Sequence, residues 1–266
     1  MIKLTHIEST APNAPALFLI PGGPGLSSGT LRSLDLLSRS FHLYYVDLPG
    51  TNGIPFDRER SLTRLAEDLA DEIRKVSRPA FVLGHSFGGF LAAEAAIRSG
   101  SAIGVICVST PFSKECQDIA VENYVDARSP ELKVAEERWE RAPSDASFRD
   151  WLSRYGGMYF SKNKEADGAR LLARDVCSHQ LFQSLRAEAR RLGTLLSRLK
   201  EWRGRKFFIA GNHDGLLPVE VQKRDAALGG FSFAPVADAS HFVMFDQPET
   251  VAGLIESFCA TEGRTQ

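Results

Sequence analysis

Cysteine is scarce in this sequence, and the few cysteines are scattered. The chain has four, Cys107, Cys116, Cys177 and Cys259, and no two of them form a C-x-x-C pair. Such spacing favours buried thiols in a reducing compartment over a disulfide framework or a zinc site. The sequence therefore predicts neither disulfides nor a bound metal.

Long apolar runs are also missing. Two long uncharged stretches, residues 79–93 and 99–113, each span 15 residues. A helix needs about 20 apolar residues to cross a bilayer. The first ten residues, MIKLTHIEST, include Glu8 and lack the apolar run of a secretory signal. We therefore expect no transmembrane helix, no membrane partner and a cytoplasmic location.

Neither sign of charge dominates. The 32 Lys and Arg residues oppose 33 Asp and Glu residues, which leaves a net charge of -1 and an isoelectric point near 6.6. Because nucleic-acid binding favours an excess of positive charge, no nucleic-acid partner is expected. With 43% hydrophobic and 24% charged residues, the composition is that of a globular protein with a sizeable core. A length of 266 residues predicts one large domain, or one domain with an insertion.

What the sequence does contain is an alternation of short β-branched or aromatic runs with helical patterns. This alternation predicts an α/β fold, with a mostly parallel sheet flanked by helices. The expected strands are residues 2–8, 16–20, 42–46, 81–84, 103–108, 206–210 and 231–236. The clearest expected helices are residues 61–76, 87–98 and 248–260. In the first of these, apolar residues recur at steps of three and four, and Ser61 can cap the helix.

The alternation stops between residues 111 and 203. This stretch has helical periodicity but no convincing strand, and it is too long for an ordinary connection. We therefore expect a core formed by residues 1–110 and 204–266, interrupted by a helical insertion over residues 111–203. Its last helix is predicted over residues 181–202, where leucines occupy one side and basic residues the rest. That arrangement is typical of a solvated basic face, with an anion-binding surface as the alternative.

The pattern G-x-S-x-G occurs twice, so the pattern alone does not identify a nucleophile. One copy is residues 25–29 (GLSSG) and the other is residues 84–88 (GHSFG). Only the second lies between an apolar strand and an alanine-rich helix, which is the context of a nucleophile elbow. Ser86 would then lie at a helix N-terminus, where free N–H groups favour developing negative charge. We predict that Ser86 is a nucleophile, and the alternative is a plain helix cap.

A serine nucleophile needs a base, and the base needs an acid that orients it. Asp214 and His241 each follow an expected strand in the second half of the chain. The order Ser86, Asp214, His241 is the serine, acid, histidine order associated with one fold. Asp238 is an alternative acid, although it lies only three residues before His241 on the same connection. Asp47 also follows a strand.

These features resemble the α/β-hydrolase family, and the resemblance covers nearly all of the chain outside the insertion. Residues 21–25 (PGGPG) are similar to the H-G-G-P-G loop of prolyl iminopeptidases, with Pro21 in place of the histidine. By this resemblance the N–H groups of Gly23 and Phe87 would form the oxyanion hole, each donor contributing about 3 to 4 kcal/mol to a transition state. The resemblance also implies that Asp47 shapes a loop. It further implies that the insertion is a helical cap following the strand that corresponds to the family's sixth.

Two fragments of the insertion add to the likeness to prolyl iminopeptidases. The caps of those enzymes carry a Trp-Glu pair and a Tyr-Phe pair, with glutamates that bind the substrate's free amine. Trp139-Glu140 and Tyr159-Phe160 stand here in the same order. Gly156 lies where a second such glutamate would be expected. GHSFGG also replaces the family's GGSWG, and DLPGTNG replaces its DQRG pattern.

Aromatic residues recur along the insertion at steps of about three and four, which favours core packing or a substrate wall. Together with the Trp-Glu and Tyr-Phe pairs, they form a set of expected substrate-binding residues. The set is Trp139, Glu140, Trp151, Tyr155, Tyr159 and Phe160, and Phe148 belongs to the same aromatic spacing. Within it, Glu140 would be the anchor for a substrate ammonium group.

The sequence thus predicts a serine hydrolase that cleaves a small ester or amide through an acyl-enzyme, with a small ester or short peptide as substrate. An esterase and a prolyl-iminopeptidase-like aminopeptidase both fit. A receptor-like protein that binds without turnover, and a C–C hydrolase or lyase using the same three residues, stay open. No nucleotide-binding glycine motif is present, so no cofactor is expected. A serine at position 86 argues against the related dehalogenases and epoxide hydrolases, which attack through an aspartate.

Overall fold

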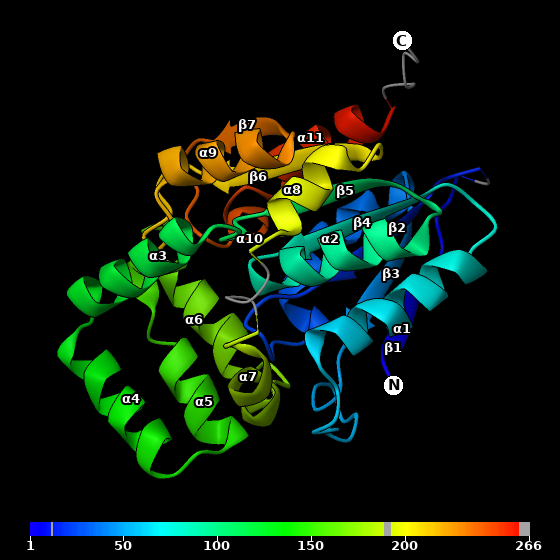
Figure 1. Ribbon diagram of the computed structural model, residues 1–266. Helices are drawn as coiled ribbons and strands as arrows, with labels where there is room; N and C mark the ends of the chain where they lie inside the picture. The colour runs from blue at the N-terminus through cyan, green and yellow to red at the C-terminus, as the bar shows by residue number, and fades with distance from the viewer. Residues whose placement is uncertain (12, 189–192, 261–266) are drawn as a thin grey trace.

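The computed structural model describes residues 1–11, 13–188 and 193–260, and a seven-stranded sheet forms its centre (Figure 1). The strands are β1 (Lys3–Ile7), β2 (Ala16–Ile20), β3 (His42–Asp47), β4 (Ala80–His85), β5 (Ala102–Val108), β6 (Arg205–Gly211) and β7 (Ser232–Val236). Their order in the sheet is β1-β3-β2-β4-β5-β6-β7. β1 pairs antiparallel with β3, and the other neighbours pair in parallel. The mostly parallel sheet expected from the sequence is confirmed.

Helices flank this sheet and also fill the chain between β5 and β6. The helices around the sheet are the 3-10 helix η1 (Ser28–Arg39), α1 (Leu62–Lys75), α2 (Phe87–Ser99), α9 (Val219–Gly229), α10 (Val243–Asp246) and α11 (Pro248–Ala260). Those between β5 and β6 are α3 (Lys114–Ala127), α4 (Pro130–Arg141), α5 (Asp145–Leu152), η2 (Gly156–Met158), α6 (Glu165–Ala173), α7 (His179–Leu185) and α8 (Leu195–Glu201). No helix within the described ranges has the length and apolar character needed to cross a bilayer.

Both faces of the sheet are buried because side chains alternate along each strand. In β2, Leu17 and Leu19 join the apolar cluster on one face, while Phe18 and Ile20 join the cluster on the other. η1 and α11 pack on the first face, and α1, α2 and α8 pack on the second (Figure 1). Each such side chain contributes about 1.5 to 3 kcal/mol when fully buried. The two apolar clusters therefore hold the strands in place, and the site is built at the ends of the strands.

The single helix expected over residues 181–202 is wrong. The structure has α7 and α8 there: α7 ends at Leu185 and is followed by a turn at residues 186–188, and α8 begins at Leu195, while residues 189–192 of the prediction lie outside the described ranges. Leu181 and Leu185 of α7 join the same apolar cluster as Leu195 and Leu199 of α8. The chain turns at residues 186–188, so the leucines of two separate helices pack against this cluster.

The solvated basic face expected for this helix also needs correction at Arg198. Its guanidinium lies 2.5 Å and 3.1 Å from the two carboxylate oxygens of Glu94, which is buried in α2. Arg98 approaches the same carboxylate at 3.0 Å. Arg198 therefore compensates a buried charge on the core, and α8 packs against α2 as part of the sheet's cover.

Candidate active site

Ser86 lies at the sharp turn between β4 and α2. Its backbone has a φ of 51° and a ψ of -121°, which L residues rarely adopt, and its N–H donates to the Val108 carbonyl at 2.7 Å. Strain of this kind costs about 1 to 3 kcal/mol and persists only where the surroundings fix it. The Ser86 side chain is partly exposed at the start of α2. The strand-turn-helix context predicted for Ser86 is thus present.

Glycines make this turn possible. A Cβ on Gly84 would collide with the backbone of Gly88. A Cβ on Gly88 would lie 2.5 Å from the carbonyl oxygen of Ile20, closer than real Cβ atoms approach. Gly22, in the loop after β2, is similarly close, because a Cβ there would lie 3.1 Å from Ser86 Cβ. The turn therefore packs directly against the loop that carries the predicted oxyanion donor.

The two predicted oxyanion donors come from this loop and from the start of α2. Gly23, with a φ of 113°, lines the same cavity as Ser86. Phe87 is the first residue of α2, so its N–H has no acceptor within the helix. Both backbone positions adjoin the Ser86 turn, which is the arrangement that an oxyanion hole requires.

His241 and Asp214 meet beyond the ends of β7 and β6. His241 Nδ1 lies 2.9 Å from Asp214 Oδ2, and both residues are buried. Because an ionised carboxylate only accepts hydrogen bonds, Nδ1 carries the proton and Nε2 is left as the basic nitrogen. Asp214 Oδ1 accepts from the N–H groups of Leu216 at 3.0 Å and Leu217 at 2.9 Å. These bonds stabilise the carboxylate in the orientation that holds His241.

The two alternative acids have other surroundings. The Asp47 carboxylate accepts from the N–H of Ser28 at 2.8 Å and from its hydroxyl at 3.0 Å, so Asp47 shapes the loop after β2. Asp238 lines a different groove, together with His213 and Gln247. The acid that contacts His241 is therefore Asp214.

The insertion holds the loop that carries His241. The Asp246 carboxylate Oδ2 accepts from the N–H of Ser240 at 2.8 Å and from that of Ser161 at 2.9 Å, and so joins the two segments. The ring of Tyr159 stacks on His241, with centroids 5.3 Å apart and an angle of 17°. Burial raises the pKa of Tyr159, which keeps this phenol neutral beside the imidazole.

A cavity of about 560 Å³ opens where these elements meet, and Gly23, Ser86 and His241 all line it. Five of the six expected substrate-binding residues line its walls: Trp139, Glu140, Trp151, Tyr155 and Tyr159. Phe160 differs, because its ring packs in the core. The centroid of its ring lies 4.9 Å from that of Phe242 and 5.4 Å from that of Phe245. Direct substrate contact is therefore not assigned to Phe160.

Several residues that line the cavity were not predicted from the sequence. Tyr124 of α3 lines the cavity and accepts a hydrogen bond of 2.8 Å from Trp151 Nε1. Phe182 and Arg186 line it as well, from α7 and the residue after it. No motif marks these three residues. Leu217 also lines the cavity. It could have been predicted, because residues that follow the acid at a strand end are placed close to the site.

A profile of the alpha/beta hydrolase family matches residues 17–254 of this chain. The chain belongs to the alpha/beta hydrolase family. The match runs from β2 to β7, including the whole insertion, and it spans all three residues of the predicted triad. The fold expected from the sequence is thus confirmed at the level of the family.

Curated relatives match parts of this alpha/beta hydrolase. The putative carbamate hydrolase RutD of Cronobacter sakazakii is 32% identical over 112 residues, which cover 41% of each chain. Phytyl ester synthase 1 of Arabidopsis thaliana is 29% identical over 101 residues, covering 37% of this chain and 14% of the relative. The matches thus span less than half of either relative. A thermophilic esterase from Thermogutta terrifontis has a TM-score of 0.74 at 16% identity, over 97% of this chain and 92% of its own, and so shares the fold.

His85 lies behind the nucleophile of this alpha/beta hydrolase. The imidazole is buried, and its Nε2 lies 3.1 Å from the backbone carbonyl of His241. Nδ1 has no hydrogen-bond partner among the described residues and faces Gly22. Burial, and then the neighbouring His241, hold the pKa of His85 well below its ordinary value. His85 is thus neutral and donates from Nε2, which links the nucleophile turn to the histidine loop.

The neutral state of His85 predicts a pH-dependent stability. Below about pH 6.5 the unfolded chain protonates this imidazole and the folded chain does not, so the free energy of unfolding falls as pH falls. In His85→Asn this contribution is absent. The stability gap between wild type and variant is therefore expected to shrink by up to about 2 kcal/mol from pH 7 to pH 5. Urea unfolding at both pH values measures the gap, and an unchanged gap would refute the assignment.

Proposed function

We propose that this alpha/beta hydrolase is a serine esterase that cleaves a small ester through an acyl-enzyme on Ser86, with residues 111–203 as its cap. The observation that carries the proposal is the 2.9 Å hydrogen bond between His241 and Asp214, formed at the cavity that Ser86 also lines. A partly exposed serine on a strained turn, in one cavity with a histidine that a carboxylate holds, is an arrangement that suits acyl transfer.

The proposed reaction begins with attack of Ser86 Oγ on the ester carbonyl carbon, while His241 Nε2 takes the hydroxyl proton. The oxyanion that forms accepts hydrogen bonds from the N–H groups of Gly23 and Phe87. The C–O bond to the alcohol then breaks, and His241 gives its proton to the leaving oxygen. Water attacks the acyl-enzyme with His241 as base again. The acid product leaves, and Ser86 regains its proton.

Asp214 acts through His241. Its carboxylate holds Nδ1–H, which leaves Nε2 as the basic nitrogen for Ser86, and its negative charge stabilises the imidazolium that forms during each proton transfer. The two N–H groups from Leu216 and Leu217 fix that carboxylate from the opposite side. In this scheme His241 Nδ1 keeps its proton throughout.

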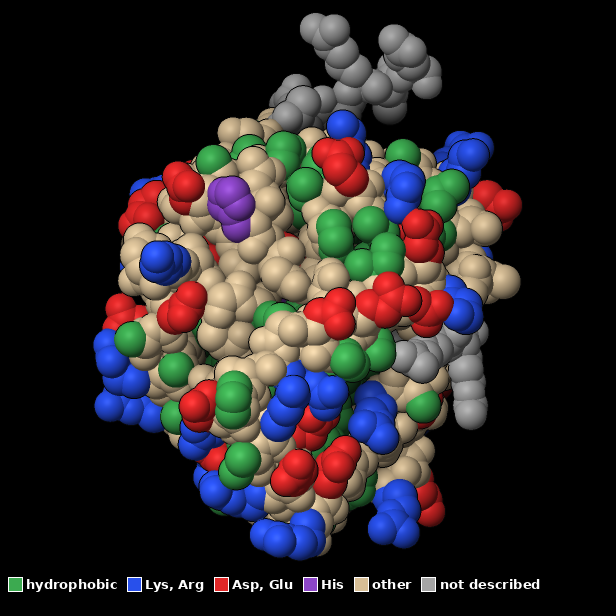
Figure 2. All heavy atoms as spheres, turned by 90° about the vertical axis from the view of Figure 1, so that its left-hand side faces the viewer, with side chains coloured by type: hydrophobic (Ala, Val, Ile, Leu, Met, Phe, Trp, Pro, Cys, Tyr) green, Lys and Arg blue, Asp and Glu red, His purple; other side chains and the backbone are tan. Residues whose placement is uncertain are grey.

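The cavity walls favour a substrate with an apolar part. Trp139 and Trp151 stack with centroids 4.6 Å apart, and Tyr155 stacks on Tyr159 at 4.2 Å. Stacked rings present a rigid apolar surface to a ligand, at about 0.5 to 1.5 kcal/mol per pair beyond their burial. The face that carries α3 and α4 has acidic and basic side chains interspersed (Figure 2), so it attracts no single sign of charge.

The aminopeptidase alternative depends on Glu140. Glu140 lines the cavity, as an ammonium anchor must, but the residue is exposed. An exposed carboxylate attracts an ammonium weakly, because water screens the charges. This difference favours an ester substrate over an N-terminal residue of a peptide.

Substrate preference separates the two activities. We expect kcat/KM for p-nitrophenyl acetate to exceed that for proline or alanine p-nitroanilide by about a hundredfold or more, since Glu140, the expected anchor for the free amine, is exposed to water. The two substrate types can be compared by release of the coloured product. Preferred cleavage of the anilides, lost selectively in Glu140→Gln, would instead support the aminopeptidase.

A further inference from the structure

The loop that would hold the oxyanion is anchored by the insertion. This oxyanion loop, residues 21–29, leaves β2 and contains glycines with φ of 113° at Gly23 and 98° at Gly25. Glycine backbones of this kind have many accessible conformations, so the loop needs external contacts to keep one of them. Asp47 of β3 supplies such contacts at Ser28, and residues 175–178, between α6 and α7, supply others.

Asp175 makes the first contact. Its Oδ2 accepts from the backbone N–H of Ser27 at 3.0 Å, and its Oδ1 accepts from the Ser27 hydroxyl. The Ser27 hydroxyl also accepts from the N–H of Gly29 and so caps η1. One carboxylate of the insertion therefore fixes both the backbone and the side chain of Ser27 in the oxyanion loop.

Ser178 makes the second contact. Its N–H donates to the Gly25 carbonyl at 2.8 Å, and a Cβ on Gly25 would collide with the Ser178 carbonyl. The loop thus has no room to move toward the insertion. Together with Asp175, this bond holds the oxyanion loop at positions two and four residues after Gly23.

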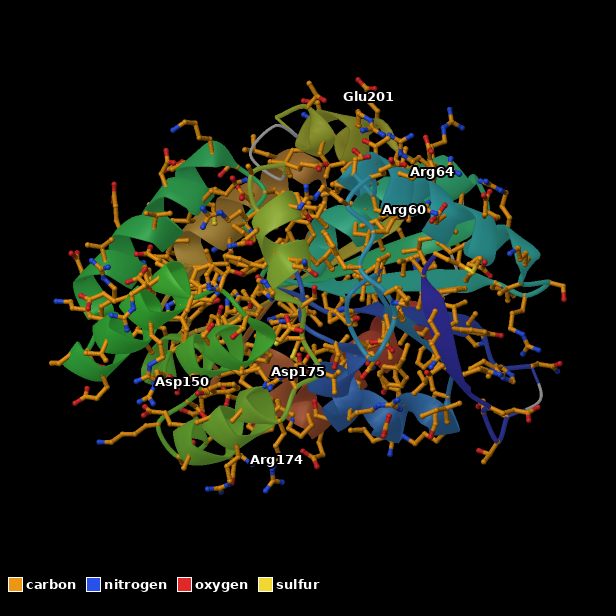
Figure 3. The ribbon with its side chains drawn as sticks, turned by 90° about the horizontal axis from the view of Figure 1, so that it is seen from below. Arg60, Arg64, Asp150, Arg174, Asp175 and Glu201 are labelled. Atoms are coloured by element: carbon orange, nitrogen blue, oxygen red, sulfur yellow. The ribbon has the colours of Figure 1, made fainter. Side chains whose placement is uncertain are left out.

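Burial sets Asp175 apart from a surface contact. The residue is 6% exposed and lies against the segment that carries η1, whereas its neighbour Arg174 lies at the outer edge of the molecule (Figure 3). Burial raises the pKa of Asp175, the bonds from Ser27 oppose that shift, and of the charged groups facing it Asp47 adds to the shift while Arg149 opposes it. A carboxylate is costly to bury and is retained where its hydrogen bonds matter.

We propose that Asp175 is a positioning residue for the oxyanion hole: it sets the oxyanion loop, and through it the Gly23 N–H, from within the insertion. The inference rests on the proposed function. Oxyanion donors act because they are already aimed at the developing charge, and misplacement by about 1 Å can cost about a hundredfold in rate. Cap and core would therefore both be required for efficient acylation.

The test is Asp175→Asn. The amide keeps the size of the carboxyl but turns one acceptor into a donor, which then faces a Ser27 donor. We expect kcat for p-nitrophenyl acetate to fall about tenfold to a hundredfold, with KM changed less than about threefold. Affinity for a trifluoromethyl ketone, which forms a tetrahedral adduct on Ser86, should fall by the same factor as kcat/KM. Affinity for the carboxylic acid product should stay the same.

Asp167→Asn is the matched control. It makes the same chemical change at an exposed carboxylate that pairs with Arg170 on α6 and borders the same groove as Asp175. We expect wild-type kcat from this variant. Ser27→Ala removes the hydroxyl that donates to Asp175, and it provides a second test if Asp175→Asn fails to fold. Its kcat should fall about threefold to tenfold, and the double variant should be no slower than Asp175→Asn, because both changes break one link.

Hydrogen exchange of the amides in residues 21–29 separates this inference from the proposed function. Faster exchange in Asp175→Asn, combined with the loss in kcat, supports the positioning role. Unchanged exchange, or faster exchange with unchanged kcat, overturns it. If wild type shows no turnover that depends on Ser86, the proposed function fails, and loop exchange still decides whether Asp175 holds the loop.

Discussion

Ser86→Ala is expected to lower ester turnover by about a millionfold, to the level that binding and oxyanion stabilisation alone provide. Alanine has no oxygen to form the acyl-enzyme, and nothing else in the turn replaces it. The variant should also lose labelling by a fluorophosphonate probe, which phosphonylates an activated serine. Stopped assays with p-nitrophenyl acetate and gel detection of the probe measure the two losses independently.

Ser101→Ala is a suitable control, because Ser101 is an exposed serine just before β5. It should turn over substrate and take up the probe like wild type. Wild-type labelling of Ser86→Ala would mean that another serine is the nucleophile. Ready labelling of wild type with slow release and tight ligand retention would instead favour a receptor-like protein.

The strands were predictable because their signal is local. In β2 both faces are buried, so the run ALFLI contains no charged residue and is easy to recognise in the sequence. The strand expected at 206–210 is Arg205–Gly211 in the structure, and the one expected at 231–236 is Ser232–Val236. Because parallel strands end at one edge, locating the strands also indicated which polar residues would meet. That reasoning brought Asp214 and His241 together from sequence alone.

The insertion was less predictable because its structure depends on distant contacts. The leucine spacing that predicted a helix over residues 181–202 continues from α7 into α8, since both helices bury leucines in one cluster. Nothing in the sequence signals that Asp175 contacts Ser27, 148 residues away. Phe160 keeps the aromatic spacing of the cavity wall but points into the core. The spacing of apolar residues predicts which side chains share one side of a helix. It does not predict what packs against that side.

The closeness of the nucleophile turn to β2 predicts a second large effect. In an exposed helix, replacing glycine by alanine usually stabilises a protein by up to about 1 kcal/mol. At Gly88 the new Cβ would lie 2.5 Å from the Ile20 carbonyl oxygen, which is backbone and cannot swing away. We expect Gly88→Ala to lose about 3 kcal/mol or more of unfolding free energy, a fall in Tm of about 6 to 12 °C.

Gly253→Ala makes the same change in α11, where nothing lies within 4 Å of the added Cβ. This control should keep its activity and gain up to about 1 kcal/mol. Gly88→Ala should also lose about a hundredfold in kcat, because the helix start that carries the Phe87 N–H must move away from the oxyanion loop. Thermal unfolding and ester kinetics on the pair measure both effects. Equal behaviour of the two variants would mean that the turn and the loop can separate without loss, which the proposed oxyanion hole does not allow.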